Sequence, residues 1–516
     1  MKQNVKIDPA ALDKLFEPFD RTDAPGFAVG VALGGRPVYR RGVGMASVEL
    51  PVALSPTIRM RIGSTTKHFC VLAAMLLAEE GKLSIDDSPR RYIQELPEWA
   101  EPVTIRQLMS HTSGMRDCLD LILHAAGPGR SAGPDTQLKM LSRLDSVNFL
   151  PGKSWSYNNG GYVLLTEIIE RVSGKEFGAF LRERILDPIG MYDTLVRPLD
   201  SELLANSATL HVSRPDGGWE RGDFGTPIKG EGGIASTVDD MLLWLRHMSN
   251  PIVGTPATWE AMRTPVVTSG YGLGLTMDSY RGLRTVHHAG AVVGGSSQMI
   301  KVIDHELDII IMTNGISSIH LYELVDRIID TCIPDLPAPE WRVPEAPVVT
   351  GTFYSRDTAR VLKLEERDGI QAIDLGGLTL PARLHPDDTL SVALLSDDFR
   401  VRILSDEAIE VHENGETDRL DRVVVPVGAN LDDYLGEYAN SAAQMRAQLT
   451  REEDGGFRLL LQGELGECGY VVTPIGPNLW QAHETSRLPL VLTLEFQKDG
   501  FLMTTGRTNR LRFVPA

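Results

Sequence analysis

The sequence predicts an α/β (α+β) domain, an antiparallel sheet flanked by helices, followed by two small antiparallel β-barrels. Strand-like runs stand at both ends of the first 330 residues with mostly helical patterns between them, so distant strands would share one sheet. Five prolines then interrupt the chain at 333–349 and predict a stiff linker. Beyond this linker, helical periodicity gives way to short alternating strands, which is typical of barrels or sandwiches.

The elements of the first part follow from local patterns. Residues 26–42 predict two strands around a Gly-Gly-Arg-Pro turn. Helices are predicted at 103–114, 161–174 and 237–248. Strands are predicted again at 270–277, 296–303 and 306–313.

The C-terminal part contains a short repeat. "GTFYS" at Gly351 and "GEYAN" at Gly436 each precede a strand, about 85 residues apart. The repeat predicts two copies of one lipocalin-like barrel. We expect a first domain at 1–334 and barrels at 348–427 and 430–516. Small barrels usually have filled interiors, so we expect these to shape and gate a site rather than to hold an apolar ligand.

Composition excludes several classes of protein. The chain has 516 residues, 42% of them hydrophobic, and a formal net charge of -18, which argues against nucleic acid or an anionic membrane as partner. The N-terminal residues contain no apolar h-region, so no signal peptide is predicted. Four separated cysteines without C-x-x-C spacing predict neither a zinc site nor disulfides. We therefore expect a cytoplasmic protein without metal or cofactor.

The stretch "RIGSTTKHFCVLAAMLLAEEGKL" (61–83) predicts a helix of unusual character. It is apolar on nearly every face, which is typical of a buried helix. Ser64 and Lys67 stand at i and i+3 and so share a face near its start. A buried ammonium is costly unless it finds partners or loses its proton, and either outcome involves the serine hydroxyl. The alternative is a serine cap beside a snorkelling lysine.

Two further motifs follow the S-x-x-K motif in order: "SYNNGG", with Tyr157 and Asn159, and "VHHAGAVVGG", with His288. Together they resemble the motifs of the penicillin-recognising serine hydrolases, which include class C β-lactamases, DD-peptidases and D-aminopeptidases. The segments "PTIRMRIGSTTK", "MSHTSGMRD" and "GEGGIASTVDDM" are also similar to segments of the class C branch. The resemblance covers about residues 10–330 and implies the class C β-lactamase/DD-peptidase-like fold.

The resemblance also implies roles for the four named residues of the first two motifs. Ser64 would be the nucleophile and Lys67 would keep its hydroxyl deprotonatable. Tyr157 would share proton transfer with Lys67 and protonate the leaving group, provided that neighbouring cations favour its ionisation. Asn159 would hold the lysine and the substrate amide. Taken alone, the Tyr157 motif is as typical of an Asn-Gly turn.

The third motif differs from that of most relatives. His288 stands where β-lactamases and DD-peptidases have a lysine that supports a substrate carboxylate, and a histidine would supply a weaker positive charge. It could also be a satisfied core histidine. Gly290 would let a substrate backbone approach the strand, and the N–H groups of Ser64 and Ala291 would form the oxyanion hole.

The H-x-G variant and the two barrels resemble D-aminopeptidase, in which a loop from the last barrel reads the substrate's ammonium. The corresponding segment would be 476–489, with Glu484 as the anion; the alternative is a solvated loop acid. His111 and Arg116 are expected to tie down a loop outside the site. "GRSAG" (129–133) matches the nucleophile elbow G-x-S-x-G, but its flanking glycines and prolines predict a surface loop instead.

These observations predict a metal-independent serine hydrolase that removes N-terminal D-residues from a small peptide or amide. An esterase or β-lactamase with the same machinery is one alternative, and a non-catalytic ligand-binding homologue is another. We expect no nucleic acid and no membrane as partner, and a homodimer remains open.

Overall fold

The computed structural model describes residues 5–127, 129–130, 132–214, 216–315, 321–344, 348–393, 398–484 and 490–516. The chain divides into two compact units. The first comprises Met1–Gln94, Thr104–Ser110 and Tyr162–Ala338, and the second comprises Glu95–Val103, His111–Gly161 and Pro339–Ala516. Residues 111–161, which lie within the expected first domain, therefore belong to the same compact unit as the C-terminal strands.

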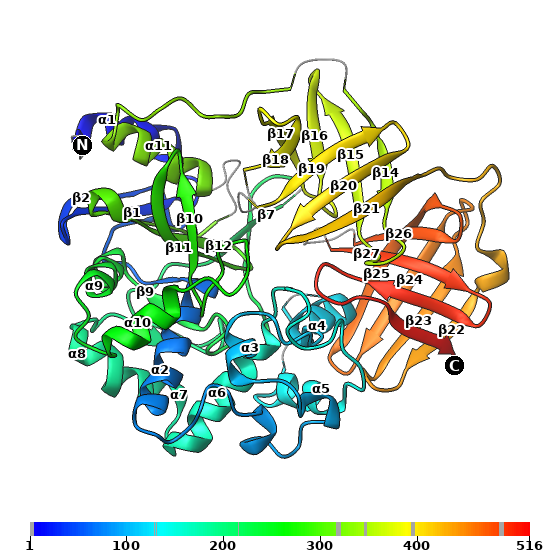
Figure 1. Cartoon of the computed structure of the whole chain (residues 1–516), viewed down its shortest axis with the longest axis horizontal. Coiled ribbons are helices and arrows are strands. Elements are labelled where there is room, and N and C mark those ends of the chain that lie inside the picture. The colour runs from blue at the N-terminus through cyan, green and yellow to red at the C-terminus, as the bar shows by residue number, and fades with distance from the viewer. Residues whose placement is uncertain are drawn as a thin grey trace. The chain divides into compact units, whose positions relative to one another are not determined.

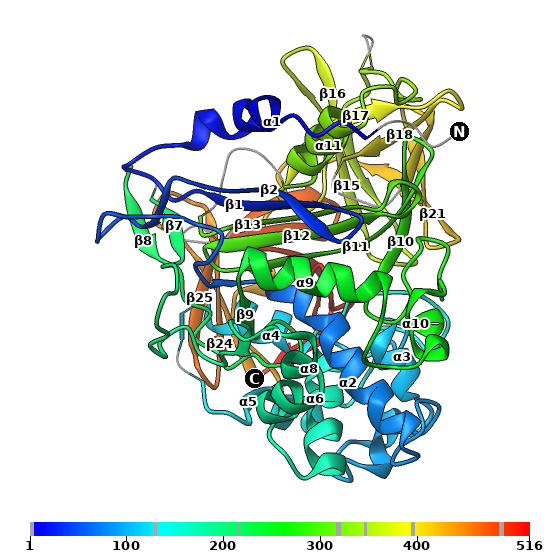
Figure 2. The ribbon, with the colours of Figure 1, turned by 90° about the vertical axis from the view of Figure 1, so that its left-hand side faces the viewer.

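A six-stranded antiparallel sheet forms the centre of the first unit (Figure 2). Its strands, in spatial order, are β10 (Thr276–Tyr280), β11 (Leu283–Val292), β12 (Gly295–Val302), β13 (Leu307–Thr313), β1 (Phe27–Leu33) and β2 (Arg36–Val43). Strand β1 lies between β13 and β2, with Phe27 opposite Thr313. Strands from the two ends of this unit thus share one sheet, as the sequence predicts.

One predicted strand begins later than expected. Residues 270–275 form turns, because Gly270 and Gly274 adopt positive φ angles of 84° and 72°. The Gly272 N–H donates to the Leu275 carbonyl at 2.8 Å, which closes the chain on itself. Strand pairing with β11 therefore begins only at Thr276, opposite His287.

Helices cover both faces of this sheet (Figure 2). On one face lie α1 (Pro9–Phe16) and α11 (Leu321–Cys332), and on the other lie α9 (Val238–Ser249) and α2 (Lys67–Glu79). Helix α9 approaches β1 so closely that a Cβ at Gly30 would lie 2.5 Å from a Val238 methyl group. Thr237 caps α9 by accepting from the Asp240 N–H, as the sequence predicts.

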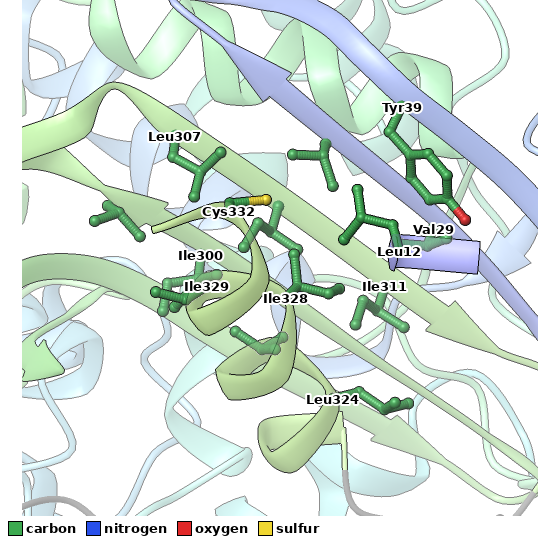
Figure 3. Packing of buried hydrophobic residues seen from close by; sticks show 14 of the residues in the cluster. Leu12, Val29, Tyr39, Ile300, Leu307, Ile311, Leu324, Ile328, Ile329 and Cys332 are labelled. Atoms are coloured by element: carbon green, nitrogen blue, oxygen red, sulfur yellow. The ribbon is translucent and has the colours of Figure 1, made fainter. Parts of the chain in front are cut away.

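The core above the sheet is mainly aliphatic (Figure 3). Leu324 and Ile328 of α11 lie over Val29 and Ile311 of the sheet, and none of these four side chains is more than 1% exposed. The helix shows the i, i+4 spacing that places such residues on one face. Burial of this face holds the terminal helix against the sheet.

Further short elements complete the first unit. Its other strands are β3 (Met45–Ser47), β4 (Val52–Ala53), β5 (Met60–Arg61), β6 (Leu195–Val196), β7 (His211–Ser213), β8 (Trp219–Arg221) and β9 (Ile234–Ser236). Its other helices are η1 (Glu17–Phe19), η2 (Gly63–Thr66), η3 (Pro89–Arg91), α3 (Ile105–Met109), α6 (Gly160–Ser173), α7 (Phe177–Leu181), η5 (Arg182–Leu186), α8 (Asp187–Ile189), α10 (Pro256–Arg263) and η6 (Ile303–His305). The helices predicted at 161–174 and 237–248 are confirmed. Helix α3 ends early, since His111 has a positive φ of 61°.

Two closed eight-stranded antiparallel barrels dominate the second unit (Figure 1). The first contains β14 (Gly351–Tyr354), β15 (Val361–Arg367), β16 (Ile370–Asp374), β17 (Thr379–Leu384), β18 (Thr389–Val392), β19 (Arg400–Ser405), β20 (Ala408–Glu413) and β21 (Glu416–Val423). The second contains β22 (Gly436–Asn440), β23 (Met445–Arg451), β24 (Phe457–Gly463), β25 (Gly466–Gly476), β26 (Leu479–Glu484), β27 (Val491–Gln497), β28 (Gly500–Thr504) and β29 (Leu511–Pro515). Gly351 and Gly436 open the first strand of each barrel, which confirms the repeat.

Helices α4 (Cys118–Ala126) and α5 (Thr136–Arg143) belong to the same unit as the barrels. Helix α4 lies against the second barrel, where the Tyr470 hydroxyl donates to the His124 carbonyl at 2.8 Å. A Cβ at Gly463 would lie 2.9 Å from the Ala125 methyl group, so the strand needs glycine there. In the described part of the chain, no helix has the length and apolarity needed to cross a bilayer.

The aliphatic core predicts the cost of a cavity under α11. Replacing Ile328 with alanine should lower the free energy of unfolding of the first unit by about 2–5 kcal/mol, because the methyl groups lost are fully buried. Arg327→Ala on the same helix removes only an exposed ion pair with Glu323 and should cost about 1 kcal/mol or less. Urea unfolding of both variants measures the difference, and equal costs would contradict this packing.

Candidate active site

The first unit contains Ser64 in the 3₁₀ turn η2, directly before α2. Lys67 begins α2, and its Nζ donates to Ser64 Oγ at 3.1 Å although the lysine is 0% exposed. The ammonium also donates to the Glu231 carbonyl at 2.6 Å and lies 5.1 Å from the centre of the Tyr162 ring. The buried charge thus has polar partners, and one of them is the serine hydroxyl.

The serine turn is fixed to the sheet by close backbone contacts. A Cβ at Gly290 of β11 would lie 1.8 Å from the Ile62 carbonyl oxygen, so only glycine allows this approach. Ser297 Oγ of β12 donates to that same carbonyl at 2.7 Å and lies 2.9 Å from Thr65 Oγ1. These contacts on both sides of Ser64 hold its hydroxyl in place.

Ala291 of β11 lies beside the serine turn. Its backbone N is 2.6 Å from the point where a Cβ at Gly63 would lie, and Gly63 has a positive φ of 52°. Strand β10 begins only at Thr276, opposite His287, so residues 288–292 have no neighbouring strand on that side in the described part of the sheet. An extended substrate backbone can pair with such an edge.

His288 is buried and neutral. Its Nδ1 donates to the Ala289 carbonyl at 2.6 Å, so its Nε2 is the atom that accepts from the Tyr271 hydroxyl at 3.1 Å. Burial, followed by the nearby Lys67 charge, lowers the pKa of His288 to about 3. The sequence predicts a weak positive charge at His288, and this prediction is wrong near neutral pH.

Tyr157 and Asn159 lie in the second unit, in a loop that His111 orders. The Asn158 N–H donates to His111 Nδ1 at 3.0 Å, and the Ser156 N–H donates to the His111 carbonyl at 3.0 Å. The His111 and Tyr157 ring centres are 4.3 Å apart. The expectation that His111 ties down a loop is confirmed, and the loop is the one that presents Tyr157.

Asp117 is a central residue of the second unit that sequence reasoning missed. It is 0% exposed and caps α4 by accepting from the Leu119 N–H at 3.0 Å. Its other oxygen accepts from the Asn159 backbone N–H at 3.0 Å and from Asn159 Nδ2 at 3.3 Å. The amide nitrogen of Asn159 thus faces the carboxylate, which directs its Oδ1 away from Asp117. An aspartate directly before an apolar run indicates the start of a helix, so Asp117 before Cys118 could have been predicted as a helix cap.

The hairpin 505–510, between β28 and β29, contacts this loop region. Arg507 Nη1 donates to Asp117 Oδ2 at 3.4 Å, and the guanidinium carbon lies 4.9 Å from the centre of the Tyr157 ring. Arg116 donates to the Asn509 carbonyl and to Asn148 Oδ1, so it ties loop and hairpin together. Burial lowers the pKa of Arg116 to about 10.

In its described residues, 476–484, the expected substrate-reading loop is mostly strand. Gly476 ends β25 and residues 479–484 form β26, while 485–489 lie outside the described residues. Residues 479–482 after the Pro-Asn turn are all buried, and β26 pairs with β25 and β27 inside the barrel sheet. Glu484 lies opposite Tyr470 in the strand register. Burial raises the pKa of Tyr470 and of Cys468, and the Glu484 charge adds to both shifts. Its role in substrate binding stays a prediction.

The segment "GRSAG" has no elbow geometry in its described part. Gly127 and Gly129 have positive φ angles of 72° and 76°, and no strand precedes them among the described residues. Ser131 lies outside the described residues.

The chain is similar to a known protein family, to curated relatives and to solved structures. The profile of the Beta-lactamase family matches residues 12–327. A D-aminopeptidase of Brucella anthropi is 27% identical over 98% of this chain and 96% of its own. A D-aminopeptidase of Brucella canis is 30% identical over 67% of this chain and 66% of its own. The structure of the octameric penicillin-binding protein homologue from Pyrococcus abyssi aligns with a TM-score of 0.59 at 20% identity, covering 89% of this chain and 99% of that one.

The burial of His288 predicts its protonation state. Ring-nitrogen NMR signals of His288, identified by their loss in His288→Asn, should show a neutral ring with protonated Nδ1 between about pH 5 and 8, well above its pKa of about 3. An imidazolium pattern near pH 6 would contradict this burial. Because the unfolded state takes up the proton first, this histidine should also make stability rise with pH between about 3 and 6.5.

Proposed function

The chain belongs to the Beta-lactamase family, and from this premise we propose that it is a D-stereospecific serine hydrolase that removes N-terminal D-residues from peptides or amides. The observation that carries the proposal is the buried Lys67 ammonium 3.1 Å from Ser64 Oγ. The match to a D-aminopeptidase over 98% of this chain, barrels included, supports the substrate class. The proposal assigns chemistry to the domain 1–334 and a shaping role to the barrels at 348–427 and 430–516.

In the first half of the reaction, Ser64 Oγ attacks the amide carbonyl carbon. Its proton passes to the base that Lys67 and Tyr157 provide, and the N–H groups of Ser64 and Ala291 stabilise the carbonyl oxygen as it becomes negative. The C–N bond then breaks, and Tyr157 returns the proton to the leaving amine. The products are an ester on Ser64 and a free amine.

In the second half, water attacks the ester carbon and loses a proton to the same base. The C–O bond to Ser64 breaks and the serine recovers its proton. The sum is one amide plus one water giving one carboxylic acid and one amine, with the enzyme unchanged. Asn159 is assigned to the substrate amide, and the open edge at 288–292 supports pairing with the substrate backbone.

The neutral His288 favours amides with a free amine over β-lactams. A cation at this position supports a substrate carboxylate in most β-lactamases and DD-peptidases. Here the ring makes two hydrogen bonds and carries no charge near neutral pH. Esters use the same nucleophile and remain a second candidate class, since the site groups described do not distinguish an ester carbonyl from an amide carbonyl.

The nucleophile is tested directly. Ser64→Ala should abolish both turnover and covalent labelling by a fluorophosphonate, because the attacking oxygen is lost. Lys67→Ala should lower kcat/KM by about 10³-fold or more, because activation of the hydroxyl is lost. Lys82→Ala, just beyond the same helix, removes an exposed lysine and should leave kcat/KM unchanged. Near-normal rates in Ser64→Ala would rule out the assignment.

The substrate class is tested with a panel. The rate with D-alanine p-nitroanilide should exceed the rates with its L-isomer, nitrocefin and short-chain p-nitrophenyl esters when kcat/KM values are compared. A neutral residue at position 288 leaves the nitrocefin carboxylate without its usual cation, so that rate should be lowest. Preference for esters or nitrocefin would overturn the peptidase assignment and leave Ser64 as nucleophile.

A further inference from the structure

The Tyr157 ring has a cation from the second barrel over its face. The guanidinium carbon of Arg507 lies 4.9 Å from the ring centre, within the range of a cation–π contact. We propose that Arg507 is a positioning residue of the hydrolase: its charge stabilises the phenolate of Tyr157, a task for which His288 is unsuited. The inference rests on the function proposed above and adds a residue to its machinery.

The hairpin that carries Arg507 is firmly held. The Arg507 carbonyl accepts from Asn148 Nδ2 at 2.8 Å, and the Asn509 N–H donates to Asn148 Oδ1 at 2.9 Å. Within the hairpin, the Thr508 N–H donates to Thr505 Oγ1 at 2.8 Å, and that hydroxyl in turn donates to Asp120. The guanidinium is therefore presented from a fixed backbone.

Asp117 orients the guanidinium and keeps it charged. Its buried carboxylate pairs with Arg507 at 3.4 Å, and the arginine side chain is 39% exposed. Burial opposes the charge of Arg507, but the carboxylates of Asp117 and Asp120 outweigh it, so the pKa of Arg507 is raised. The guanidinium is then a charge that favours the phenolate of Tyr157 over the neutral phenol.

His111, Asp117 and Asp120 do not provide this cation. His111, 4.3 Å away ring to ring, accepts from the Asn158 N–H at its Nδ1 and so is not an imidazolium in this arrangement. Asp117 and Asp120 interact with Arg507 and carry the opposite sign or none. Within this unit, Arg507 is the cation that the described contacts place at the Tyr157 ring.

The first measurement reads the phenolate itself and needs no turnover. Ultraviolet difference titration against Tyr157→Phe, made in the Arg507→Gln, Arg507→Lys and Arg510→Gln backgrounds as well as in wild type, isolates this tyrosine among the twelve. In Arg507→Gln the titration midpoint should rise by about one pH unit or more, because an opposite charge at this range is removed. Arg507→Lys should change it less. Arg510→Gln is the matched control, since Arg510 lies on the same hairpin and donates to the Asp357 carbonyl instead.

The second measurement is the pH profile of kcat/KM with D-alanine p-nitroanilide. A higher phenolate midpoint moves the ascending limb of Arg507→Gln to higher pH. Activity near neutrality should then fall about tenfold for each pH unit by which the midpoint rises, and it should recover in alkali. A loss that is equal at all pH values, or an unchanged midpoint in a variant with unchanged thermal stability, would overturn the proposal.

Two further outcomes separate this proposal from its premises. If Arg507→Gln unfolds, Arg507→Lys, which keeps the charge, shows whether Arg507 sets the titration midpoint of Tyr157 or only supports the fold. Absence of turnover and of labelling in wild type would instead refute the hydrolase function, while the titration would still report on Arg507.

Discussion

The hydrogen bond between the Lys67 ammonium and Ser64 is the interaction on which the first unit depends for its chemistry. A fully buried lysine is stable only if its charge is matched by acceptors, and here a serine hydroxyl and the Glu231 carbonyl serve. The surrounding structure supplies those acceptors at fixed positions. The glycine at 290 and the Ser297–Thr65 contact hold the turn, and the aliphatic layer under α11 holds the strands that present them.

Much of the fold follows from the sequence, because its signals are local. Periodicity or turn chemistry predicts each of three elements: the apolar helix after Ser64, the capped helix at 237–248, and the barrel strands that begin at Gly351 and Gly436. Local patterns mislead where a segment can form either a strand or turns. The stretch 270–277 alternates as a strand does, yet its glycines allow turns that tertiary contacts select.

The proposed site was predictable only in part. Ser64, Lys67, Tyr157 and His288 could be named as candidates because they stand in ordered motifs. Asp117 ends the segment "MSHTSGMRD", but nothing in that segment marks the aspartate as a partner of Arg507, which stands in no motif and lies 390 residues further along the chain. The charge of His288 could not be read from its identity either, because burial and the neighbouring ammonium decide it. Motifs name the reacting groups, whereas partners and protonation depend on three-dimensional contacts.

The long sequence separation between Asp117 and Arg507 has a consequence for biosynthesis. A ribosome releases the serine turn and the Tyr157 loop well before the β28–β29 hairpin, and contacts of such long range form late in folding. A nascent chain therefore carries Ser64 for some time without the arginine that faces the tyrosine. With the roles proposed for Ser64, Tyr157 and Arg507, full reactivity would be acquired only by a chain that has completed the second barrel.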